Sequence, residues 1–281
     1  MIKSVDLPGT IFNDYKELIK EVKKNKDIII AEKKAQIYKS IDKGLAVSVN
    51  QEYINKQVQQ TKSIELDSNY YYFVVNSSNF LDSHNDLHIE GNWEKSAKEQ
   101  KGKCFFIFDH VLKRDEIIAM KEDIEMFTAT IPFKALGKDF EGDTYCLIYK
   151  IAKNKIVNKQ AKEWLDSGYS FECSVRMQYM DIELATNPEF DEDEKSNEFY
   201  NKYYSSIVNK NDFDKIPYFW IIKQAKNVLE SSWVMFGSNG ATGLIQENKS
   251  EAETLTPEKS EPSVDTQKLK EELVKLLTKF D

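Results

Sequence analysis

Arginine and histidine are scarce in this chain. Of its 39 basic residues only two, Arg114 and Arg176, are arginines, and it has three histidines, His84, His88 and His110. Histidine is the side chain whose ordinary pKa lies near neutrality, so an acid–base mechanism that uses an imidazole must draw on these three positions. Only the two arginines can supply a planar guanidinium that stays charged and binds a carboxylate through two hydrogen bonds.

Cysteine and long apolar runs are scarce as well. Cys104, Cys146 and Cys173 are widely separated among apolar neighbours, a pattern typical of reduced core residues rather than of a disulfide framework or a zinc site. No window approaches the ~18 uninterrupted apolar residues of a membrane helix. The chain begins Met-Ile-Lys-Ser-Val-Asp, without the apolar segment of a signal peptide. We therefore expect a reduced protein with no membrane partner.

The composition is that of a globular protein. The chain has 281 residues, of which 41% are hydrophobic and 12% aromatic, enough for a real core in one large domain or two small ones. Its formal charge is −8, from 47 acidic against 39 basic residues. This balance argues against a nucleic-acid binder, because contact with phosphates needs a basic surface.

Hydrophobic periodicity predicts helices and strands in an α+β domain at 1–246. The first helix is expected after Asn13, its predicted N-cap. The run 104–108, Cys-Phe-Phe-Ile-Phe, is apolar enough that both its faces should be buried. Further helices are predicted at 50–60, 93–100 and 155–165, and strands at 27–31, 45–49, 70–75, 104–108, 124–131, 144–151, 169–179, 218–222 and 229–236.

The segment 169–179 alternates strictly between apolar and polar side chains. Its even positions are Ser170, Glu172, Ser174, Arg176 and Gln178, and its odd positions are all apolar or aromatic. This pattern predicts a half-buried strand whose other face is polar and carries a serine, an acid and an arginine. Most such faces are merely solvated, so the pattern alone does not indicate a function.

Three segments are predicted to lie outside the core. The acidic, tyrosine-rich stretch 187–211 carries consecutive acids rather than acids at ligand spacing, which favours a solvated surface excursion over a metal site. Residues 247–263 have the polar composition of a disordered linker. Residues 264–281, capped by Ser263 or Asp265, form an amphipathic helix that would dock on a partner or fold back onto its own domain.

The histidines differ in their surroundings. His84 and His88 have the i, i+4 spacing of a helical metal pair, but Asn85 and Asp86 favour a loop, so a metal site is only weakly indicated. His110 follows an apolar strand and therefore lies at the rim of the core. It is either a strand-end histidine bonded to backbone or a functional group.

Four pieces of the chain occur in a familiar order. They are Asp-x-His-x-Asp-x-x-x-x-Gly-x-Trp at 82–93, an apolar strand ending in His at 104–110, a Gly-led strand with Ser-Val at 168–177, and Leu-Glu-x-Ser-x-Val with an Asn-x-Ala turn at 229–241. In this order the chain resembles the prohead (capsid maturation) serine proteases of tailed phages.

The resemblance implies a fold similar to herpesvirus assemblin: a mixed, mostly antiparallel sheet curled into a barrel with surrounding helices, here with a tethered C-terminal helix. It also implies a serine nucleophile and a general-base histidine, which carry over to Ser174 and His110.

The third catalytic position is less defined. Glu230 is the candidate carboxylate that orients His110, and its rivals are His84, His88 and Asp109, since herpesvirus relatives use a second histidine. Many family members have glycine where this chain has Arg176. An arginine on the face of the nucleophile could steady a developing oxyanion.

We therefore expect a capsid maturation serine endopeptidase that cleaves scaffold and capsid precursors, and itself, inside the assembling shell in the host cytoplasm. Its partners would be capsid and scaffold proteins or a second copy of the chain, with no cofactor and no metal. Two other classes stay open: a non-catalytic virion structural protein with this fold, and a metal-dependent hydrolase that uses His84, His88 and an acid.

Overall fold

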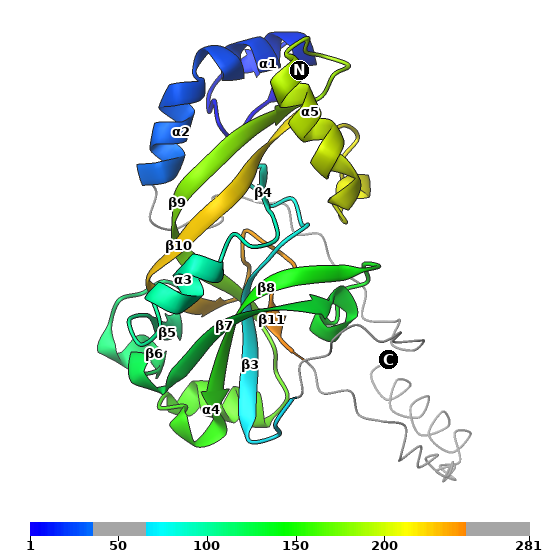
Figure 1. Cartoon of the computed structure of the whole chain (residues 1–281). Coiled ribbons are helices and arrows are strands. Elements are labelled where there is room, and N and C mark those ends of the chain that lie inside the picture. Colours follow the sequence, from blue (N-terminus) through cyan, green and yellow to red (C-terminus); the bar gives the residue numbers. More distant parts are fainter. Residues whose placement is uncertain (36–65, 246–281) are drawn as a thin grey trace, which may run out of the picture. The chain divides into compact units, whose positions relative to one another are not determined.

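Two long neighbouring strands organise the fold. In the computed structural model, which describes residues 1–35 and 66–245, β9 (Glu172–Thr186) and β10 (Tyr218–Val234) pair antiparallel over most of their length (Figure 1). On the other edge of β10, β4 (Asp86–His88) and β5 (Phe105–Phe108) pair parallel to it at different heights. β6 (Ile117–Ala119) then pairs antiparallel with β5.

A second sheet is wholly antiparallel. Its strand order is β11 (Gly243–Leu244), β3 (Tyr70–Ser77), β8 (Asp143–Ala152) and β7 (Ile124–Pro132). The short strands β1 (Ile2–Lys3) and β2 (Ile11–Phe12) form a separate pair. The fold is thus α+β with mixed and antiparallel sheets, and within the described ranges the strand pairings do not close a barrel.

Five α-helices accompany these sheets in the described part of the chain. They are α1 (Tyr15–Lys24), α2 (Lys26–Ala35), α3 (Glu94–Glu99), α4 (Lys159–Asp166) and α5 (Glu194–Tyr203). Helices α2 and α5 pack on β9 (Figure 1). The N-cap of α1 is Asp14, whose carboxylate accepts from Glu17 N at 2.8 Å, and not Asn13 as predicted.

Aromatic side chains from both sheets form the main core. The ring of Phe73 on β3 lies 4.6 Å from Phe106 on β5 and 6.0 Å from Trp233 on β10. Cys173, Val175, Met177 and Tyr179 of β9 are all buried in the same cluster. The odd positions from Cys173 to Tyr179 therefore face the core, as their spacing predicts.

Most predicted strands and helices are present, with shifted ends. The strands expected at 70–75, 104–108, 124–131 and 144–151 correspond to β3, β5, β7 and β8, and the helix expected at 93–100 is α3. The helix expected at 155–165 begins only at Lys159, where Asn158 caps it. Four predicted segments lie outside the described residues: the strand at 45–49, the helix at 50–60, the linker at 247–263 and the helix at 264–281.

Three predictions about strands were wrong in type or extent. Residues 27–31 belong to helix α2, because the apolar run there is too short to distinguish a strand from a helix, and α2 buries Ile29 and Lys33 on one face. The alternating strand starts at Glu172 and leaves Tyr169 59% exposed. The two strands expected at 218–222 and 229–236 are one strand, β10.

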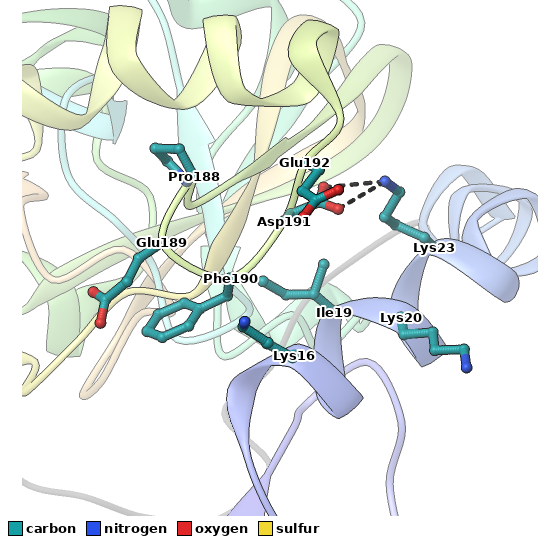
Figure 2. Close-up of a pocket in the computed structure, with 9 residues that line it drawn as sticks. All are labelled: Lys16, Ile19, Lys20, Lys23, Pro188, Glu189, Phe190, Asp191 and Glu192. Atoms are coloured by element: carbon teal, nitrogen blue, oxygen red, sulfur yellow. Dashed lines mark hydrogen bonds and ion pairs between the residues drawn. The ribbon is translucent and has the colours of Figure 1, made fainter.

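The acidic stretch 187–211 is more than a solvated excursion. It contains α5, whose Tyr200 is buried and donates to Ile216 O at 2.8 Å. Its Asp191 and Asp193 both accept from Lys23 Nζ of α1, at 3.0 and 3.1 Å. Figure 2 shows Lys23 reaching Asp191. Both residues line an open hollow of about 410 Å³. These acids therefore fasten α1 to the stretch 187–211.

The ion pairs of Lys23 should make the stability pH-dependent. Burial raises the pKa of Asp191, but hydrogen bonds from Thr186 and Lys23 outweigh it and hold that pKa below its usual value, and the hydrogen bond from Lys23 lowers the pKa of Asp193. The stabilisation is complete above the unfolded pKa of about 3.9 and is lost as pH falls through the lower folded values.

We predict that Lys23→Met lowers the free energy of unfolding at pH 7 by about 0.5–1 kcal/mol. The difference in stability from wild type should begin to shrink below about pH 4 and vanish only as pH falls through the lowered folded pKa values of the two acids, where both become protonated. Thermal melts from pH 3 to pH 7 test this, with Lys20→Met on the same helix as the matched control. A gap that is constant with pH would contradict the assignment.

Candidate active site

His110 lies on a strained turn directly after β5. Asp109 and His110 both have left-handed backbone, with φ of 47° and 58°. Such a conformation costs a residue other than glycine of order 1–3 kcal/mol and persists only where surrounding contacts hold it. Two side chains hold the backbone of His110: Ser232 Oγ accepts from its N at 2.9 Å, and Arg176 Nη2 donates to its O at 3.4 Å.

The ring of His110 is fixed by Glu230. Its Nδ1 lies 2.8 Å from Glu230 Oε1, and Glu230 is fully buried. The same carboxylate accepts from Arg176 Nε at 2.9 Å and from Ser232 Oγ at 2.7 Å. A buried carboxylate is tolerated when its charge is paired and its oxygens are hydrogen-bonded, and Glu230 meets both conditions.

A bulge in β10 places the side chain of Glu230. Asn227 pairs with Met177 and Ser231 pairs with Val175, so that three residues of β10 lie opposite the single residue Arg176 of β9. Leu229, inside this bulge, has a φ of 69°. Bulges of this kind bend the strand and redirect a side chain, often beside a functional site.

Buried hydrogen bonds fix both ends of the bulge. Asn227 N donates to Ser96 Oγ at 2.8 Å, and Asn227 Nδ2 donates to Ser231 Oγ at 3.0 Å. All three side chains are buried. The carboxylate is thus held by the strand on which it lies as well as by its own contacts.

Ser174 shares a sheet face with these groups. It is the direct antiparallel partner of Ser232, and directly opposed residues present their side chains on the same face. Arg176, two residues further along β9, bonds Glu230 on that face. The structure therefore brings Arg176, Glu230 and the turn of His110 together, and it places Ser174 on the same face of the sheet.

Cys173, next to Ser174, faces the other way. It is buried in the main core, and burial raises the pKa of its thiol. Burial likewise raises the pKa of Cys104 to about 11. Because the thiolate is the reactive form of cysteine, burial makes both thiols poor nucleophiles at neutral pH.

The other candidate residues lie elsewhere. His88 is buried, stacks on Trp93 at 5.7 Å between ring centroids, and has its Nδ1 2.7 Å from Asn92 Nδ2. It pairs with Ile222 of β10, eight strand residues before Glu230, which puts it roughly 20 Å or more along the strand. His84 lies in the same loop, with Nδ1 4.0 Å from Asp82 Oδ2.

The structure does not favour Asp109 or a metal ion in place of Glu230 at the site. Asp109 is exposed, and the ring of His110 bonds Glu230. Among the residues that the structure describes, no group of three or more His, Cys, Asp and Glu side chains could hold a metal ion. The metal-dependent hydrolase therefore gains no support from the described part of the chain.

The role of Ser232 was not predicted from the sequence. This side chain accepts from the backbone of His110 and donates to the carboxylate of Glu230, so it links the turn to the strand. The sequence does contain a signal for this contact, because residues 230 and 232 of one strand point to the same face of the sheet.

Comparisons of the chain with protein-family models, with curated proteins and with solved structures give no match. No helix in the described ranges is long and apolar enough to cross a membrane.

The left-handed turn predicts opposite effects for two substitutions at the exposed residue Asp109. Asp109→Gly should leave stability unchanged or raise it, because glycine adopts positive φ without steric cost. Asp109→Val should lower the free energy of unfolding by about 1–2 kcal/mol, because a β-branched side chain clashes in this conformation. Urea unfolding of the two variants measures the difference. Equal stabilities would show that residue 109 does not adopt this backbone.

Proposed function

We propose that this chain is a serine endopeptidase in which Ser174 is the nucleophile, His110 the general base and Glu230 the carboxylate that orients the histidine. One observation carries the proposal. The ring of His110 is bonded to a buried carboxylate, and its backbone is bonded to Ser232, the strand partner of Ser174. A serine hydroxyl becomes a useful nucleophile when an oriented imidazole can take its proton.

The contacts define a role for each group. Glu230 binds Nδ1 of His110, so Nε2 is the nitrogen that exchanges the proton with Ser174 Oγ. As Oγ bonds to the scissile carbonyl carbon, Nε2 takes the hydroxyl proton and then delivers it to the leaving amine. Water attacks the resulting acyl-serine by the reverse proton path, which releases the acid product and restores Ser174.

Arg176 supports this arrangement from the same strand as Ser174. Its Nε compensates the charge of Glu230, and its Nη2 holds the carbonyl of the strained His110. Stabilisation of the oxyanion by this guanidinium is part of the proposal, since the arginine lies two residues from the nucleophile on its own face.

The resemblance to prohead proteases supplies the substrate class. We place the activity in capsid maturation, on scaffold and capsid precursors and on the chain itself, inside the procapsid in the host cytoplasm. An assemblin-like barrel and a docking role for the helix at 264–281, on a capsid or scaffold protein or on a second copy, belong to the same proposal.

Covalent labelling tests the nucleophile. A biotinylated fluorophosphonate should modify wild type at Ser174, and Ser174→Ala should abolish the adduct. His110→Ala should slow the labelling by at least about 10². Ser170→Ala, at an exposed position on the same sequence stretch, is the matched control and should label like wild type. An adduct that persists in Ser174→Ala, or a wild type that never labels, would favour the non-catalytic virion protein.

Loss of the charge on Glu230 should slow turnover without unfolding the chain. We expect Glu230→Gln to reduce kcat by about 10²–10⁴, as loss of an orienting carboxylate does in other triads. It should also cost about 1.5–3 kcal/mol of stability, because Arg176 loses a charged acceptor. Peptide cleavage and thermal melts measure the two effects, with the exposed Glu125→Gln as control. An unchanged kcat would remove Glu230 from the mechanism.

A further inference from the structure

Two large apolar side chains are exposed just after the strand that carries Glu230. Met235 and Phe236 are 68% and 65% exposed. The residues on both sides of them, from Ser231 to Val234 and from Gly237 to Asn239, are all buried. The pair therefore protrudes from a segment that is otherwise packed into the protein.

The backbone around this pair is held rigidly. Gly237 N donates to Glu172 Oε2 at 2.8 Å, and Ser83 N donates to Ser238 O at 3.2 Å. Asn239 Nδ2 donates to Ser77 O at 2.8 Å. A Cβ on Gly237 would lie 2.7 Å from Cys173 O, so the segment also packs directly against β9. With these contacts the loop cannot easily turn its two apolar side chains inward.

The loop lies toward the face of Ser174. Glu172, two residues before Ser174 on β9, projects to the same face, and its carboxylate holds Gly237 N. Two residues of a strand span about 6.6 Å. Gly237 directly follows Phe236, so the loop meets β9 about two strand residues from Ser174, a distance that a bound peptide would span within two or three residues.

We infer that Met235 and Phe236 form a subsite for a large apolar side chain of the peptide substrate. The inference rests on the proposed endopeptidase function. A thioether and a phenyl ring match an aliphatic or aromatic side chain, because burial of apolar surface on both partners is favourable and methionine adapts its shape. The rigid loop adds selectivity, since little ordering is needed when the peptide binds.

The test is a cleavage profile on a proteome-derived peptide library, with new termini read by mass spectrometry. The full-length wild type should enrich Leu, Ile, Met or Phe at one fixed position within three residues of the cut bond. Met235→Ser/Phe236→Ser should lose this enrichment. For a synthetic peptide with leucine at that position, kcat/KM should fall about tenfold, mainly through KM. Ile28→Ser, at a residue 60% exposed on α2, is the matched control.

The outcomes separate the inference from the function on which it rests. A wild type that forms no fluorophosphonate adduct refutes the function itself. Labelling of Ser174 in both proteins with identical cleavage profiles refutes the subsite and leaves the endopeptidase standing. A double variant that loses labelling as well shows that the pair maintains the site structure, which also overturns the subsite. A changed oligomeric state on gel filtration with an unchanged profile assigns the pair to contact between copies.

Discussion

The arrangement of the site depends on one buried charge, the carboxylate of Glu230. A carboxylate away from water is costly unless it is paired, and this one is paired from three directions. Its donors come from the turn after β5, from β9 and from its own strand. The contact with His110 joins positions 120 residues apart in the chain. The charge therefore stabilises the tertiary structure, because its hydrogen bonds join elements that are far apart in the sequence.

Strain is concentrated around the same carboxylate. Asp109, His110 and Leu229 all have positive φ, and the first two are consecutive. None is a glycine, so each costs free energy that the contacts of Glu230, Arg176 and Ser232 must offset. The polar network and the strained backbone are therefore interdependent. The network keeps the turn and the bulge in place, and these in turn direct the side chains into the network.

The sequence was most informative where the alternation of apolar and polar residues decides which face of a strand each side chain occupies. Strict alternation from Glu172 onward predicts which side chains of β9 are buried, and it puts Ser174 and Arg176 on one face. The resemblance to prohead proteases made His110 and Glu230 candidate neighbours, and the structure brings them to 2.8 Å. Alternation therefore accounts for the shared face of Ser174 and Arg176, and the contact between His110 and Glu230 was predicted only through the resemblance.

Other features could not be obtained from the sequence because they depend on tertiary contacts. The bulge in β10 interrupts its alternation, so the strand was divided into two. Helix α2 was taken for a strand because its apolar run is short, and the tertiary contacts of its last turn are not visible in the sequence: Lys33 Nζ is buried 2.9 Å from both Asp6 and Asp86. The roles of Ser232, Met235 and Phe236 likewise follow from positions across the sheet.

The buried thiol of Cys173, next to Ser174, gives the protein an internal reporter of local opening. Cys173 reaches solvent only when β9 separates from the core, because its side chain packs among Trp233, Val175 and their neighbours. Native-state opening of a strand can be followed through a group that reacts only in the open form. The rate at which a thiol reagent modifies Cys173 therefore measures how often the strand that carries Ser174 opens locally, independently of any reaction at Ser174.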